Sequence, residues 1–156
     1  MKKKLFVLIT VTFLLTGCSF YTKKSLTYDV DTGDDIKVEL KTNGGYNMKD
    51  DKNNKIHLAA IKFLKNDEKI ATGYFDYASE YDDIEDDIDS GLYDDYLENV
   101  KKIDDTANDT ICYKYLIDYR SYCRIKVKGS KTMFTIYNED YEELLDLLDR
   151  ITVEKK

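Results

Sequence analysis

Apolar and polar residues alternate along several short stretches of the chain, and the first clear one covers residues 36–40. Aliphatic side chains at Ile36, Val38 and Leu40 are separated by charged ones, which is the spacing of a strand with one buried face. The sequence Asn43-Gly44-Gly45 follows and favours a tight turn. The pattern therefore predicts that the folded body begins near Ile36.

A hairpin is predicted over residues 56–77. The apolar run 56–63 changes phase at Ala59-Ala60, where a bulge would account for the change. Asn66-Asp67 provides a turn, and residues 70–77 then predict the returning strand.

The period changes to that of a helix over residues 79–103, where apolar residues recur at helical spacing as far as Val100. Ser79, followed three residues later by Asp82, is a plausible start signal. Ser90-Gly91 interrupts the middle of this stretch. We therefore expect either one kinked helix or two shorter ones.

Strand alternation returns in the last third of the chain. Residues 111–117 and 123–127 predict a hairpin whose turn lies over residues 119–122. Residues 132–137 predict a further strand.

A last helix is predicted to begin after Asn138, which is a suitable N-cap, and to end near Arg150. Acidic residues in its first turn favour the helix dipole. Residues 151–153 could add a short final strand. One face of the helix is apolar and is formed by Tyr141, Leu144, Leu145 and Leu148.

The order of strands, helix, strands and helix predicts the α+β class. We expect an antiparallel sheet of about six strands with two helical segments packed on one face, in a single domain over residues 36–156. Residues 18–35 are polar and carry no sustained periodicity, so they are expected to be a tether. A flexible tether of this length would reach on the order of 20–25 Å.

The N-terminus has the layout of a signal peptide over residues 1–17. Lys2-Lys3-Lys4 is a basic segment, and the apolar stretch 5–15 that follows is shorter than the roughly 20 residues needed to span a bilayer. It ends in Leu15-Thr16-Gly17-Cys18, which resembles the lipobox of bacterial lipoproteins. The resemblance implies cleavage before Cys18, lipid on its sulfur, and anchoring to the extracytoplasmic face of the cell membrane.

A weaker resemblance concerns the body of the chain. The polar segment, the strand at residues 36–40, the middle helix, the hairpin and the Leu-rich last helix look like small uncharacterised lipoproteins of Gram-positive bacteria. The layout is also similar to the PsbP-like α/β sandwich. Neither resemblance brings catalytic residues, because neither offers a motif to match.

The charge of the chain limits the classes of partner that it is expected to bind. The formal net charge is −7, and loss of residues 1–17 removes three lysines and no acid, which takes it to −10. Nucleic acid is not expected as a partner, because binding it requires clustered Lys and Arg. An anionic lipid surface would also repel the body. The sequence contains 14 Tyr, and tyrosine-rich surfaces favour recognition of other molecules.

The sequence shows no catalytic constellation. His57 is the only histidine, no partner for it can be identified, and it is expected to be exposed or structural. Phosphate-binding loops, nucleophile elbows and HExxH motifs are absent from the sequence. We therefore expect no enzyme and no cofactor, although an enzyme acting at the envelope stays open as an alternative.

The densest group of carboxylates lies over residues 82–95. Oxygen ligands at this density can bind Ca²⁺. The spacing does not match an EF-hand loop, and such runs usually form a solvated helix face, so no metal site is expected. A Ca²⁺-binding module is kept as an alternative, with the candidate ligands Asp82, Asp83, Asp86 and Asp87.

Two cysteines of the predicted domain, Cys112 and Cys123, suggest a disulfide if the domain is exported. A turn centred on Tyr119-Arg120, however, would place Cys112 opposite Val127 and Cys123 opposite Leu116. That register does not bring the two sulfurs together. Buried free thiols are therefore favoured, and a Cys112–Cys123 disulfide stays open.

The expected function is that of a membrane-anchored, non-enzymatic binding module on the extracytoplasmic face. Its partner would be a protein or a component of the envelope.

Overall fold

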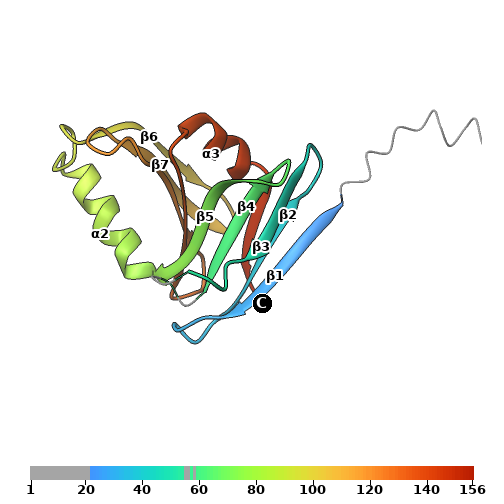
Figure 1. Ribbon diagram of the computed structural model, residues 1–156. Coiled ribbons are helices and arrows are strands. Elements are labelled where there is room, and N and C mark those ends of the chain that lie inside the picture. Colours follow the sequence, from blue (N-terminus) through green and yellow to red (C-terminus); the bar gives the residue numbers. More distant parts are fainter. Residues whose placement is uncertain (1–21, 55–56, 58) are drawn as a thin grey trace, which may run out of the picture.

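The computed structural model describes residues 22–54, 57 and 59–156. The predicted signal peptide and the predicted lipidation site, Cys18, lie outside these residues. Figure 1 shows the arrangement of the chain. The elements are β1 (Lys23–Asp29), β2 (Asp35–Lys41), β3 (Tyr46–Asp50), β4 (Ala60–Lys65), β5 (Glu68–Tyr77), α2 (Ala78–Asp89), β6 (Leu97–Asp104), β7 (Asn108–Tyr115), β8 (Ser121–Val127), β9 (Thr132–Asn138), α3 (Tyr141–Leu148) and β10 (Ile151–Lys155).

The strands form two antiparallel sheets. The small sheet has the order β1-β2-β10, and the large sheet has the order β3-β4-β5-β9-β8-β7-β6. This arrangement confirms the predicted α+β class with antiparallel pairing. The described part of the chain has ten strands in two sheets where we expected about six in one sheet, because the patterns of β1, β3 and β6 are too short or too polar to stand out.

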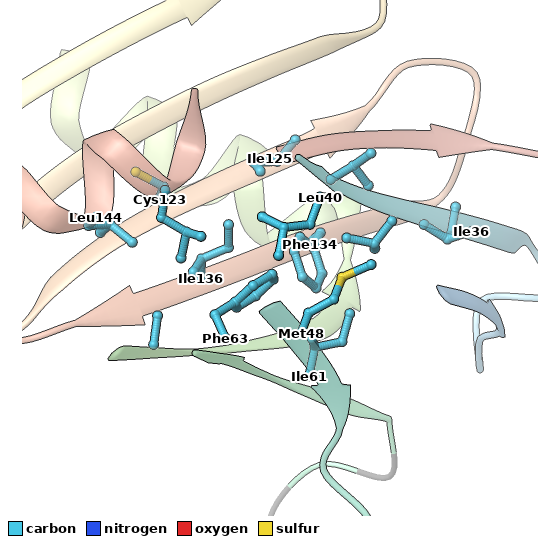
Figure 2. Packing of buried hydrophobic residues seen from close by; sticks show 14 of the residues in the cluster. Ile36, Leu40, Met48, Ile61, Phe63, Cys123, Ile125, Phe134, Ile136 and Leu144 are labelled. Carbon is cyan, nitrogen blue, oxygen red and sulfur yellow. The ribbon is translucent and has the colours of Figure 1, made fainter. Parts of the chain in front are cut away.

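The main hydrophobic core lies between the small sheet, α3 and one face of the large sheet. Figure 2 shows side chains from both sheets meeting there, with Phe63 and Phe134 near the centre. The aliphatic side chains of β2 are fully buried in this core, as the alternation over residues 36–40 predicts. Leu144 and Leu147 of α3 close it on one side.

A second, smaller core lies on the opposite face of the large sheet, beneath α2. Tyr81 of α2 packs there against Ile111, Tyr113 and Met133. Successive residues of a strand point to opposite faces of the sheet, and Cys112 of β7 belongs to the main core while its neighbours Ile111 and Tyr113 belong to the second. The main core contains residues of α3 and the second contains Tyr81 of α2, so the two helices cover opposite faces of the large sheet. We expected both helices on one face. Figure 1 shows α2 and α3 on the two sides of the large sheet.

Residues 23–29, which we expected in a flexible tether, form β1 instead. This strand pairs with β2 along its whole length, from Lys23 opposite Lys41 to Asp29 opposite Asp35. Only Leu26 and Tyr28 supply large apolar side chains, and they pack half-buried against the main core. The pattern is weak because the other face of this edge strand is exposed.

The helix predicted over residues 79–103 is shorter, because it ends at Asp89 and β6 begins at Leu97. Gly91 ends it with a φ of 76°. The amide of Leu92 donates to the carbonyl of Asp87 and that of Gly91 to Ile88, which is a Schellman motif.

Both predicted helix start signals are displaced. The N-cap of α2 is Tyr77, which makes no side-chain capping bond, so the Ser79 and Asp82 signal is not used. Asn138 ends β9, and Asp140 caps α3 by accepting a hydrogen bond from the amide of Glu143.

The other predicted features are mostly confirmed. Asn66 and Asp67 form the turn of the β4–β5 hairpin, both with positive φ. The register shift of this hairpin lies between Phe63 and Leu64, so the bulge predicted at Ala59-Ala60 is displaced. The short final strand exists as β10 and pairs with β2.

The registers give the molecule two distinct ends. One, which we call the N-end, holds Thr22 and the turns at residues 42–45, 66–67 and 116–120. The other, the C-end, holds the turns at residues 30–34 and 128–131 together with Lys156, whose amide donates to the carbonyl of Asp35. Neither helix of the described residues is long and apolar enough to cross a membrane.

Candidate functional site

A hollow of about 400 Å³ opens at the C-end, between the β1–β2 turn and the junction of β5 with α2. Its floor is apolar and is formed by Val30, Ala59 and Phe75. Four carboxylates lie around this floor, and we call the site the acidic hollow. They belong to Asp29, Asp31, Asp76 and Glu80.

Asp76 is the innermost of these carboxylates. It is half-buried and accepts a hydrogen bond of 3.3 Å from the hydroxyl of Thr135. Burial raises the pKa of Asp76, and burial together with the charge of Asp76 raises the pKa of Glu80. Among the described residues, no lysine, arginine or histidine forms an ion pair with any of the four carboxylates.

The wall of the hollow on the β1–β2 side is fixed to the β8–β9 turn. Thr32 lines the hollow, and its hydroxyl lies 2.6 Å from that of Thr132. Asp34 forms an ion pair of 2.6 Å with Lys155 and accepts hydrogen bonds from Ser130 and from the amide of Lys131. These contacts, with that to Lys155 the strongest, hold the pKa of Asp34 well below its usual range. The turn is therefore a rigid wall.

His57 lines the hollow and packs against Tyr74 of β5 in the large sheet. Its ring stacks on Tyr74 with the ring centroids 3.8 Å apart and the planes at 15°. The histidine is half-buried, and its amide donates to the side chain of Asn54. We expected an exposed or structural histidine, and the structure places it in the wall of the acidic hollow.

A tyrosine-rich face of the large sheet begins at Tyr74. We call it the tyrosine face, and it lies on the same side as α2, towards the N-end. The rings are in contact from strand to strand, with centroid distances of 6.1 Å for Tyr74 and Tyr137, 5.9 Å for Tyr137 and Tyr122, and 5.8 Å for Tyr122 and Tyr113. The face consists of Tyr74, Tyr113, Tyr115, Tyr122, Tyr137 and Arg124.

Arg124 is the cation of the tyrosine face. Its Nε donates a hydrogen bond of 2.7 Å to the hydroxyl of Tyr113, and its guanidinium lies 5.9 Å from the ring centroid of Tyr122. Burial raises the pKa of Tyr74 to about 12, so its hydroxyl stays neutral at physiological pH. The tyrosine face therefore offers neutral hydroxyls and one half-buried positive charge.

The carboxylates of α2 do not form a Ca²⁺ site in this structure. Asp82 forms an ion pair with Lys126, and Lys102 forms ion pairs with Glu85 and Asp89. No group of three or more potential ligands comes together in the part of the chain that the structure describes. The carboxylates of Asp82, Asp83, Asp86 and Asp87 are thus part of a solvated helix face.

Cys112 and Cys123 form a disulfide in the main core. They lie directly opposite each other in the β7–β8 hairpin, with their Cα atoms 4.1 Å apart. The register that we predicted is therefore wrong, because the turn covers residues 116–120 and not 119–122. The disulfide that the sequence left open is present.

No protein-family model matches the chain, and no curated protein or solved structure is significantly similar to it.

Proposed function

We propose that this chain is a binding module without catalytic activity, held on the extracytoplasmic face of a membrane by lipid on Cys18. Its acidic hollow binds a positively charged group of a protein or of an envelope component. The lipobox at residues 15–18 supports the anchor. The Cys112–Cys123 disulfide is in keeping with an oxidising compartment.

Asp76 is the observation that carries the proposed binding site. A half-buried carboxylate is costly unless a cation or several hydrogen bonds compensate for the lost water. Asp76 receives one hydrogen bond from Thr135, and no described cation lies within ion-pair distance of it. Its pKa is raised because burial outweighs that hydrogen bond and the more distant charges of His57 and Arg124. A bound cation would supply the missing charge, and Glu80 would add to the attraction.

The apolar floor indicates what kind of cation fits. A lysine or arginine side chain combines a hydrophobic stem with a charged end, and the stem can lie on apolar surface while the charge reaches a carboxylate. Val30, Ala59 and Phe75 provide such a surface beside Asp76. The net charge of the body would also speed the approach of a basic partner.

The geometry of the described residues offers no nucleophile and base pair for covalent catalysis. The ring of His57 is stacked on Tyr74, and the hydroxyl of Thr32 is paired with that of Thr132. Both cysteines of the body are joined in the main core, away from the hollow. A nucleophile and a base within hydrogen-bonding distance would be needed for covalent catalysis.

The binding site can be tested by calorimetry of the soluble body with a lysine hexapeptide at low ionic strength. We expect Asp76→Asn with Glu80→Gln to weaken binding by about tenfold or more, equivalent to ~1.4 kcal/mol. Asp94→Asn with Asp95→Asn removes the same charge from the N-end and should leave the affinity almost unchanged. Equal losses in the two double variants would mean that only net charge matters and would contradict the proposed site.

The pH dependence of the same titration gives a second readout. The pKa of Asp76 is raised, so this carboxylate becomes neutral at a higher pH than an exposed aspartate. Binding should therefore weaken as the pH falls towards the pKa of Asp76. The Asp76→Asn, Glu80→Gln variant should lose this dependence, because the pKa of Glu80 is raised as well. Removing the charge of Asp76 should not lower the stability of the protein, because a raised pKa means that the ionised carboxylate destabilises the folded state.

A further inference from the structure

Large apolar side chains are exposed together at the N-end. Ile117 is 75% exposed, Tyr119 65% and Tyr96 48%, whereas the central positions of β7 and β8 are buried. Leu92, in the segment before β6, and Leu116, in the β7–β8 turn, are exposed as well. We call this group the apolar tip, and it consists of Leu92, Tyr96, Leu116, Ile117 and Tyr119.

The backbone holds the apolar tip in place. The amide of Leu116 donates to the carbonyl of Tyr96, which joins the β7–β8 turn to the segment before β6. The amide of Tyr115 donates to the carbonyl of Arg120 and closes the turn. Tyr119 has a φ of 58°, an unfavourable value for a residue with a large side chain. Folding does not require these exposed side chains, which points to contact with another surface.

The registers place the start of the folded body at the N-end too, across the molecule from the apolar tip (Figure 1). Thr22 precedes β1, and Lys23 pairs with Lys41 beside the turn at residues 42–45. Cys18 is only four residues before Thr22, so the chain between their Cα atoms can span at most about 14 Å. Lipid on Cys18 would therefore keep this part of the N-end close to the bilayer, since β1 and the turn after it occupy residues 23–34 of the expected tether.

We propose that the apolar tip contacts the headgroup region of the lipid bilayer as a second attachment point, across the N-end from the lipid on Cys18. This inference depends on the proposed anchor. Tyrosine rings favour the membrane interface, where the ring is shielded and the hydroxyl stays hydrated. The anchor raises the effective concentration of the tip at the surface, so a small patch is sufficient.

The charge at the N-end selects the kind of lipid surface. Asp94, Asp95 and Asp118 neighbour the apolar tip in the sequence, and the nearby cations are Arg120 and Lys114, whose Nζ lies 5.6 Å from the ring centroid of Tyr119. A strongly anionic surface would repel these carboxylates. The tip therefore suits a zwitterionic or neutral region of the bilayer. Two contacts at the N-end would also turn the acidic hollow at the C-end away from the membrane, where a partner can reach it.

Tryptophan fluorescence tests this orientation directly, because the chain contains no tryptophan. The lipidated full chain carrying Tyr119→Trp is placed in phosphatidylcholine vesicles with and without brominated acyl chains. We expect emission at shorter wavelength and loss of intensity in the brominated vesicles. The matched control carries Tyr77→Trp, which places the reporter at the C-end, and its emission should be unaffected.

Two further arms separate failure of the tip from failure of the anchor. The mass of the mature protein shows whether Cys18 carries lipid, and an unlipidated mature protein would overturn both the anchor and this inference. A lipidated, vesicle-bound protein whose Tyr119→Trp emission matches that of the control would overturn the tip alone. Adding Ile117→Asp to Tyr119→Trp should reduce the quenching, as should phosphatidylglycerol in the vesicles. Unchanged quenching in either case would contradict an apolar, charge-sensitive contact.

Discussion

Replacement of Phe134 by alanine is expected to lower the free energy of unfolding by about 3–5 kcal/mol. Phe134 is fully buried in β9, where its ring centroid lies 4.9 Å from that of Phe75 and 6.4 Å from that of Phe63. Both sheets contribute side chains to this part of the core (Figure 2). The substitution would therefore leave a cavity at the contact between the sheets.

Gly73 lies against the ring of Phe134 and has no side chain that could fill the cavity. A Cβ atom added at Gly73 would come within 2.4 Å of Phe134 and 2.9 Å of Phe63. Urea denaturation followed by circular dichroism measures the loss. Ile117→Ala is the control, since that side chain is exposed and should change stability little. A loss below about 1 kcal/mol for Phe134→Ala would contradict the described core.

Removal of the disulfide by Cys112→Ala with Cys123→Ala is expected to cost about 3 kcal/mol of stability, because the bond restricts the unfolded chain across a short loop. The two residues are 11 positions apart in the sequence and are fully buried. The substitutions also leave small cavities in the main core. The same urea titration, under oxidising conditions, measures the difference from the wild type.

The control for the disulfide is reduction of the wild-type protein. In excess dithiothreitol its unfolding midpoint should move towards that of the double variant, while the midpoint of the variant stays constant. A wild-type midpoint that is insensitive to complete reduction, shown by thiol labelling of the unfolded protein, would mean that the bond contributes no stability.

Elements with one fully buried face were predictable from the sequence. The alternation over residues 36–40 gives β2, and residues 132–137 give β9, because burial on the core side demands an apolar residue at every second position. The strands β1 and β6 were missed because they are edge strands whose other face is exposed. In β6 the apolar positions also fit a helical period, so the sequence favoured a longer helix.

The wrong register at the β7–β8 hairpin has a specific cause. Leu116 and Ile117 continue the apolar character of β7, which made the turn seem to begin later than it does. Both residues are exposed in the structure. An apolar residue is normally interpreted as a buried strand position, so apolar residues in an exposed turn lead to a wrong register. Here these exposed residues belong to the apolar tip.

The acidic hollow could not be predicted from spacing along the chain. Its walls come from the β1–β2 turn, from the residues before β4 and from the end of β5, which the two sheets bring together (Figure 1). The acidic run at residues 29–35 and His57 are visible in the sequence, but their proximity to Asp76 depends on the small sheet covering the large one.

Nuclear magnetic resonance of the isotope-labelled body, titrated with a lysine hexapeptide, shows residue by residue where the cation binds. The proposed site predicts amide shifts that saturate together at Asp29, Asp31, Asp76 and Glu80, and that vanish in the Asp76→Asn, Glu80→Gln variant. The amides of the N-end should stay in place. Shifts spread over all acidic surfaces, or confined to the carboxylates of α2 beyond Glu80, would contradict a cation-binding site in the acidic hollow.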